Sequence, residues 1–331
     1  ISLSGVLTLM LVLSLLVTNM IALAVAAAVA APVANAAPTV YGIANMAFQM
    51  DAKGKDSGQS IDSIASRVGV KGSDDLGSGL KAVYKFEWGV NIDAGTFTAR
   101  NQYVGLAGGF GTVMMGRHDT PLKMSQPKDL FNDGLLDNGN MTNIGFGNTK
   151  GGEDRVAQTL AYVSPSFGGV KLAAALVPNE AATPAKDSAI TNIYSLAAMY
   201  GSKKKGLYLA AALNGADDKS GDQKYMRISA QYAVAGLIAN AMYQNSDAAG
   251  AEGSNIMIGA AYKMGKFMPK LKYSMNSEDK KSGKEGTVVA LGVDYSLGKK
   301  TKAYLEVGMF DDDFAGGKST SYNSTSIGLR H

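Results

Sequence analysis

Cysteine is absent from this chain of 331 residues, which also has only two histidines and one tryptophan. Without cysteine, the protein can form neither disulfide bridges nor a thiolate site. His118 and His331 are too few and too far apart in the sequence to form a zinc site. The sequence therefore predicts no metal and no cofactor, and the fold has to be stabilised by its own packing and hydrogen bonds.

Charged side chains are absent from residues 1–36. The apolar stretch MIALAVAAAVAAPVANA ends in small residues, and Ala34-Asn35-Ala36 fits an A-x-A cleavage site. We expect residues 1–36 to be an export signal peptide that is removed. No Lys or Arg precedes the apolar stretch, so the residues before about position 20 are expected to be mis-started or flanking sequence. The alternative is that the stretch is retained as a membrane anchor.

Signatures of catalysis and of nucleic-acid binding are also lacking. The formal net charge of +4 is spread over the chain without a dense basic tract, so no nucleic-acid partner is predicted. The glycine-rich run at 105–111 lies in a predicted hairpin turn and opens no helix, which excludes a dinucleotide site. No G-x-S-x-G motif occurs. The sequence gives no indication of an enzyme.

Alternation of apolar and polar residues is what the chain has in abundance. In the segment Leu80–Val90 the even positions are apolar or aromatic, while the odd positions include Lys81, Lys85 and Glu87. The same period of two recurs in 226–234, 288–297 and 301–309. Such a pattern predicts long strands with one apolar face and one polar face.

Short and long connections alternate between these strands, which in a closed barrel places all short turns at one rim. Counting from residue 39 gives about 16 strands, an even number as in single-chain outer-membrane barrels. We therefore predict an all-β fold, an antiparallel transmembrane β-barrel, as a single domain over residues 37–331. Its apolar face would contact lipid, whereas a soluble β-sandwich, the alternative, would bury that face.

The segment 117–154 is the longest stretch without strand-like alternation. A connection of this length inside a compact domain usually has a function of its own. We expect it to be the third external loop, folded inward into the mouth of the barrel, where it would set the bore.

Several stretches resemble the general porins of Gram-negative outer membranes, in particular those of β-proteobacteria. They are APTVYGIAN from residue 37, FTARNQYVGLAGGFGTVMMGRHDTPLK from 97, DRVAQTLAYVSPSFGGVKL from 154 and SIGLRH from 326. The resemblance covers the mature chain and is most specific from Arg67 to Lys123. It implies an outer-membrane protein, exported through the periplasm, that lets small hydrophilic solutes and ions diffuse through a water-filled channel.

The resemblance also implies partners. Family members are usually homotrimers, they lie in outer-membrane lipid and lipopolysaccharide, and they are inserted by an assembly machinery that recognises a terminal aromatic residue. This chain stops at His331, so we expect its terminal residues to be missing.

The expected site is a constriction, in which charges across a narrow aqueous path select the solute. The resemblance places arginines on its wall, and alternation adds their neighbours on the strand that begins at Leu80. The predicted wall residues are Arg67, Arg100, Arg117, Arg155, Lys81, Lys85 and Glu87.

Opposite this wall, the segment 117–154 offers Asp129, Asp133 and Asp137. Any of the three could face the arginines, or all could be solvated loop charges. A substrate-specific channel is an alternative, but it would need a lumenal ladder of aromatic side chains or a dense lysine array. A barrel enzyme would need a nucleophile at the rim. The sign of the ion selectivity stays open at this stage.

Overall fold

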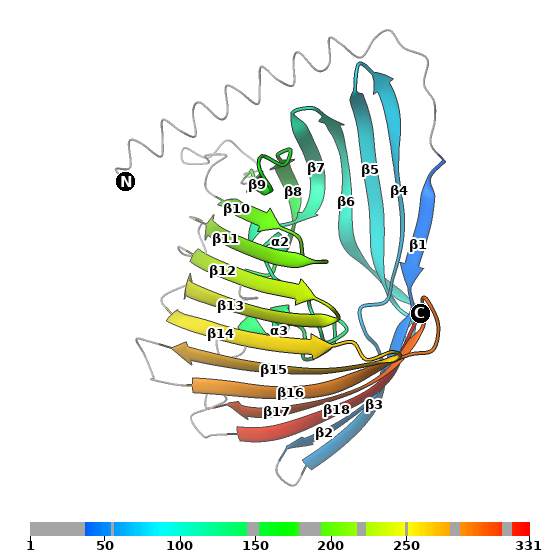
Figure 1. Ribbon diagram of the computed structural model, residues 1–331, viewed down its shortest axis with the longest axis vertical. Coiled ribbons are helices and arrows are strands. Elements are labelled where there is room, and N and C mark those ends of the chain that lie inside the picture. Colours follow the sequence, from blue (N-terminus) through cyan, green and yellow to red (C-terminus); the bar gives the residue numbers. More distant parts are fainter. Residues whose placement is uncertain are drawn as a thin grey trace.

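The computed structural model describes residues 37–53, 56–143, 152–178, 193–216, 223–248, 251–278, 285–312 and 320–331. The signal peptide expected over residues 1–36 lies outside the described residues. One antiparallel sheet of 18 strands forms most of the described chain and curves strongly (Figure 1). No helix in the described ranges has the length and apolarity of a membrane span.

The strands follow one another with short turns and with longer connections. Their bounds are β1 (Thr39–Ile43), β2 (Asn45–Lys53), β3 (Asp56–Ser63), β4 (Arg67–Gly77), β5 (Leu80–Asn91), β6 (Thr96–Gly108), β7 (Gly111–Asp119), β8 (Arg155–Val163), β9 (Val170–Leu176), β10 (Ile193–Gly201), β11 (Gly206–Ala216), β12 (Gln223–Val234), β13 (Leu237–Ala248), β14 (Ala251–Tyr262), β15 (Phe267–Glu278), β16 (Glu285–Ser296), β17 (Lys302–Asp312) and β18 (Thr320–Arg330). The β7–β8 connection, residues 120–154, contains the short helices α2 (Pro121–Met124) and α3 (Asn138–Asn143).

Neighbouring strands in the sheet are neighbours in the sequence. From β4 to β18, each strand pairs antiparallel with the next one along the chain. The last strand, β18, then pairs with β2, and β1 pairs with β4. The predicted all-β, antiparallel fold is therefore confirmed, and the C-terminal strand lies beside an N-terminal one.

The count of 18 strands exceeds the predicted number of about 16 because of the segment 39–77. Ala44 separates β1 from β2, and residues 64–66 separate β3 from β4. At the second interruption, the Ser66 hydroxyl accepts a hydrogen bond from Asn45 N at 2.9 Å and donates one to Asn45 O at 3.0 Å. A side chain thus replaces ladder bonds at this point.

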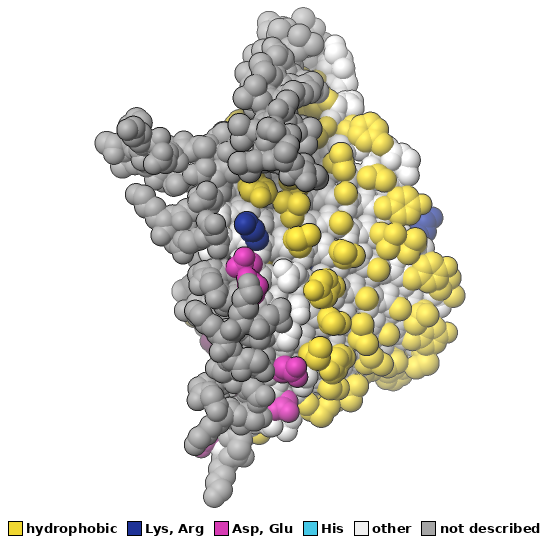
Figure 2. Space-filling model, turned by 90° about the vertical axis from the view of Figure 1, so that its left-hand side faces the viewer, with side chains coloured by type: hydrophobic (Ala, Val, Ile, Leu, Met, Phe, Trp, Pro, Cys, Tyr) yellow, Lys and Arg dark blue, Asp and Glu magenta, His cyan; other side chains and the backbone are white. Residues whose placement is uncertain are grey.

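The two faces of the sheet differ in chemistry, as the alternation predicted. On β12, Met226 and Ile228 are 64% and 63% exposed, whereas Arg227 and Ser229 are each 1% exposed. Figure 2 shows a broad field of hydrophobic side chains on the outer surface, with acidic side chains along one border. The apolar face points outward and the polar face is covered.

The main apolar core lies between the β7–β8 connection and the covered face. Leu130, Phe131, Leu136 and Met141 of the connection are buried against the sheet. Their partners on β13, β14, β16 and β17 are Met242, Met257, Ala261, Val288, Ala290 and Phe310. Each fully buried side chain of this size contributes about 1.5–3 kcal/mol, so the connection is held as a fixed part of the fold.

Candidate functional site

The β7–β8 connection begins with a turn into α2 that the sequence specifies locally. Thr120 is the N-cap, and its hydroxyl accepts a hydrogen bond from Lys123 N at 3.2 Å. Pro121 follows at the first helical position, where its missing N–H is not needed. The chain therefore leaves the sheet directly after β7.

Hydrogen bonds then attach the start of the connection to the covered face of the sheet. Leu122 N donates to Ser195 Oγ of β10 at 3.1 Å, and the Tyr208 hydroxyl of β11 donates to Ser125 O at 3.1 Å. Farther along, Lys128 N donates to a side-chain oxygen of β12 at 2.8 Å. The connection thus crosses strand after strand on the polar side.

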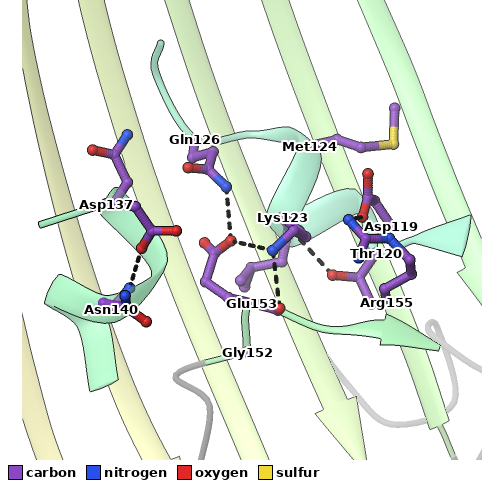
Figure 3. A network of polar contacts seen from close by, with 12 residues as sticks. Asp119, Thr120, Lys123, Met124, Gln126, Asp137, Asn140, Gly152, Glu153 and Arg155 are labelled. Carbon is purple, nitrogen blue, oxygen red and sulfur yellow. Dashed lines mark hydrogen bonds and ion pairs between the residues drawn. The ribbon is translucent and has the colours of Figure 1, made fainter. Parts of the chain in front are cut away.

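Glu153 joins the two ends of the connection to each other (Figure 3), and it also reaches β12. Its carboxylate forms an ion pair with the buried Arg227 of β12, and it accepts from Gln126 at 2.7 Å and from Lys123 at 3.3 Å. Arg227 also donates to Leu122 O at 3.2 Å. A buried charge is tolerated when it is paired and hydrogen-bonded in this way.

Lys272 of β15 holds the middle of the connection. Its buried ammonium donates to Leu136 O at 2.6 Å and to Asn138 Oδ1 at 2.8 Å, and it pairs with Asp129 at 3.3 Å. The Nζ atom also lies 4.9 Å from the ring centroid of Phe131, and this cation–π contact strengthens the anchorage.

Asp133 is the loop acid that contacts a predicted wall arginine. Its carboxylate lies 3.1 Å from Arg67 of β4 and 3.3 Å from Arg330 of β18. The Asp133 side chain is still 34% exposed, so this pair borders open space. Arg330 was not predicted, although it lies on a strand that the sequence placed correctly.

Asp129 and Asp137 have other partners. Asp129 pairs with Lys272, and Asp137 accepts a hydrogen bond from Asn140 N at 2.6 Å in the turn that begins α3. Burial, together with the nearby charge of Asp129, raises the pKa of Asp137 to about 7. The structure therefore separates the three predicted acids into three environments.

Glu87 gathers several wall residues around its buried carboxylate. It pairs with Arg100 at 2.7 Å and with Lys85 at 3.1 Å, and it accepts the Tyr41 hydroxyl at 2.8 Å. The β5–β6 register shifts between Phe86 and the residue after Glu87. Glu87 thus positions two predicted cations of the wall instead of standing alone.

Arg117 and Arg155 lie together where the connection leaves β7 and rejoins the sheet at β8. Arg155 pairs with Asp119 at 2.9 Å, and Arg117 donates to Arg155 O at 3.0 Å. The β7–β8 register shifts beside Arg117, where Gly116 has a φ of 140°. A Cβ at Gly116 would meet the backbone of Gln102, so only glycine permits this bend.

Two more lysines extend the basic wall. Lys81 is exposed on β5, opposite Asp75 of β4. Lys71, which was not predicted, lies opposite Lys85 in the ladder, and its Nζ is 5.4 Å from the ring centroid of Tyr41. Lys71 shares the parity of Arg67 on β4, and this signal could have identified it.

Cations outnumber carboxylates on this wall. The cationic side chains are Arg67, Lys71, Lys81, Lys85, Arg100, Arg117, Arg155 and Arg330, and the carboxylates paired with or directly opposite members of this set are Asp75, Glu87, Asp119 and Asp133. No group of histidine or acidic side chains within the described ranges is placed to hold a metal ion.

Comparison with known proteins decides the family. The family model described as Gram-negative porin matches residues 22–315. This chain belongs to the Gram-negative porins. Proteins of this family are channels rather than enzymes.

Curated relatives of this porin are major outer membrane proteins of Neisseria. Protein P.IB of Neisseria sicca is 27% identical over 311 residues, covering 82% of this chain and 85% of the relative. Protein P.IA of Neisseria meningitidis is 26% identical over 331 residues, covering 82% of each. The match to P.IB of Neisseria gonorrhoeae is 45% identical but spans 71 residues, 20% of that relative's length.

Solved porin structures share the fold. The anion-selective porin from Comamonas acidovorans has a TM-score of 0.78 at 22% identity, covering 89% of this chain and 99% of that one. OmpT of Vibrio cholerae in its trimer form has a TM-score of 0.64 at 18% identity, covering 89% and 99%. The outer membrane channel DcaP of Acinetobacter baumannii has a TM-score of 0.70 at 15% identity, covering 90% and 97%.

Proposed function

We propose that this porin forms a water-filled channel in the outer membrane through which small hydrophilic solutes and ions diffuse. The observation that carries the proposal is the β7–β8 connection, which is fixed on the polar face of the sheet and brings Asp133 to Arg67 at 3.1 Å. A connection held in this way can narrow an aqueous path without blocking it.

The proposed architecture is a closed barrel of 16 strands, counting β1 with β2 and β3 with β4 as two interrupted strands. The pairing of β18 with β2 supports closure. So do the two backbone bonds at the Ala44 interruption, from Ala44 N to His331 O at 3.0 Å and from His331 N to Ala44 O at 2.8 Å. In this barrel the connection is folded inward.

The proposed constriction lies between residues 117–154 and the basic wall on β4 to β8. The apolar core under the connection fills the side of β13 to β17, which leaves the aqueous path beside the arginines. Asp133 contributes the opposing charge at that place, whereas Asp129 and Asp137 are occupied elsewhere.

We further propose that the channel prefers anions. The excess of cations over carboxylates on the wall creates a positive potential, and low-dielectric surroundings focus it on the path. The Comamonas acidovorans porin of the same fold is described as anion-selective. A homotrimer is also proposed, since OmpT of Vibrio cholerae is described in a trimer form and Phe86 and Trp88 expose apolar surface on β5.

Single-channel recording in planar lipid bilayers tests this function. The purified, folded protein should give step-like conductance, in groups of three equal steps where trimers insert, with a reversal potential of anion-selective sign under a salt gradient. Folded protein that never conducts would refute the channel, and a cation-selective sign would refute the proposed preference.

A further inference from the structure

Two consecutive residues at the turn of the β7–β8 connection, Asn132 and Asp133, have left-handed backbones. Their φ angles are 56° and 62°. This conformation is uncommon for residues other than glycine, and asparagine and aspartate adopt it more readily than most. The geometry directs the two adjacent side chains to different strands. We call Asn132–Asp133 the loop tip.

Asn132 is buried, and among the described residues its side chain and backbone carbonyl contact three strands of the sheet. Its side-chain amide donates to Glu306 Oε1 at 2.6 Å and to Asp294 Oδ1 at 3.1 Å. The backbone carbonyl oxygen of Asn132 accepts a hydrogen bond from Asn45 Nδ2 at 3.1 Å. One residue of the connection therefore contacts β16, β17 and β2 at once.

The charges of Asp294 and Glu306 are already neutralised by two lysines. Lys270 lies 2.6 Å from Asp294 and 2.7 Å from Glu306, and Lys302 lies 2.6 Å from Asp294. Two positive and two negative charges form a neutral group that is largely buried. A neutral donor such as an amide completes this group, whereas a third carboxylate would be repelled and costly to bury.

Asp133 points to the other side, where it pairs with Arg67 of β4 and Arg330 of β18. With the contacts of Asn132, the loop tip connects β2, β4, β16, β17 and β18. These are the strands around the place where the last strand returns to the first ones.

We propose that Asn132 is the positioning residue of the loop tip, which holds Asp133 against the wall arginines and fastens the sheet where its last strand meets its first ones. The expected effect on the closing of single channels rests on the proposed channel function. The expected effect on the unfolding temperature does not.

The variant Asn132→Asp tests this directly, because aspartate has nearly the same shape and tolerates the same backbone. It places a third carboxylate beside Asp294 and Glu306. We expect brief closures of single channels to become at least about tenfold more frequent, since a factor of ten requires only a modest change in free energy. We also expect the folded barrel to unfold at a lower temperature in detergent.

The control is Asn91→Asp, which adds the same charge at an exposed position outside the connection, where the side-chain oxygen that accepts from Asp93 N and Ala94 N is kept. It should leave both measurements near those of the wild type. Asn132→Gly is a milder variant that keeps the left-handed backbone and removes the amide without adding charge. It should show both effects to a smaller extent, and it replaces Asn132→Asp if that protein does not fold.

The decisive experiment is the exchange Asn132→Asp with Glu306→Gln, which swaps the carboxylate and the amide and restores the charge of the group. The proposal would be supported if, relative to Asn132→Asp, the unfolding temperature rises and the brief closures of single channels become rarer again, both toward the wild-type values. Failure to recover, or an Asn132→Asp protein that matches Asn91→Asp in both measurements, would overturn it. A wild type that never conducts would refute the channel function instead, and the unfolding temperatures would still decide the role of Asn132.

Discussion

Three aspartates at intervals of four residues, Asp129, Asp133 and Asp137, illustrate how little a residue's type determines its role. Only Asp133 reaches an arginine of the wall, because the left-handed turn at Asn132 and Asp133 directs it there. Asp129 forms an ion pair with a buried lysine, and Asp137 accepts a backbone hydrogen bond in the turn that begins α3. The role of each acid follows from the local backbone.

Asp137 makes stability depend on pH. Its folded-state pKa of about 7 lies above the ordinary value, so the folded protein holds this proton more tightly than the unfolded chain does. The resulting stabilisation is complete at pH values below the ordinary aspartate range and is lost as the pH rises through about 7. We therefore expect the unfolding temperature to fall between pH 5 and pH 8, and Asp137→Asn to reduce that fall. An identical pH dependence in Asp137→Asn and wild type would contradict this, with Asp133→Asn as the comparison.

Arg67 and Arg155 are expected to set the ion selectivity. One pair of unit charges 4 Å apart in water interacts by about 1 kcal/mol, which corresponds to a factor of about five. Replacing either residue by Glu reverses its charge, which removes this attraction for anions and adds one for cations, so it should lower the anion-to-cation permeability ratio at least about fivefold, measured as a shift of reversal potential. Lys205→Glu, an exposed charge reversal in the turn after β10, is the control. Unchanged reversal potentials would place these arginines away from the path.

At the scale of elements, the β7–β8 connection behaves as a packed unit. Phe131 is fully buried, and its ring lies 4.9 Å from both Lys270 Nζ and Lys272 Nζ. Within residues 120–143, the short helices α2 and α3 are the regular secondary structure, so the course of this stretch depends on such anchors.

Phe131→Ala should consequently release the middle of the connection. Loss of a buried phenylalanine costs about 3–5 kcal/mol, and the cation–π contacts would be lost with it. We expect a lower midpoint of urea unfolding and faster cleavage of the connection by protease, with Phe131→Leu giving a smaller change. A midpoint equal to that of the wild type would show that the anchor is not needed.

The strands were predictable because the period of two is a local property. Leu80–Val90 was recognised from its own residues, and it corresponds to β5. The helices α2 and α3 were not predicted, since they are too short to show a helical period. The interruption at Ser66 was not predicted either.

The sequence predicted candidate residues for the site but not the contacts between them. Alternation and resemblance selected the arginines as candidates, and length selected the connection, but neither could show which residues of the two contact each other. Asn132 and Glu306 are 174 positions apart, and no local pattern relates such residues. Lys270 and Lys272 lie on the polar face of their strand, yet their role as anchors requires the course of the connection.

At the scale of the whole molecule, the covered face is divided into two halves of different chemistry. The connection packs its apolar side chains on β13 to β17, and cations dominate the face of β4 to β8. In the proposed barrel, the aqueous path is therefore displaced from the axis toward the basic half.

The contacts of Asn132 also lead to an expectation about the order of folding. Its partners Asn45, Asp294 and Glu306 lie on strands from both ends of the chain, 87 to 174 positions away. They come together only when β16, β17 and β2 have assembled, and contacts so distant in sequence form slowly. We therefore expect the connection to reach its final position late, after β16, β17 and β2 have paired with their neighbours.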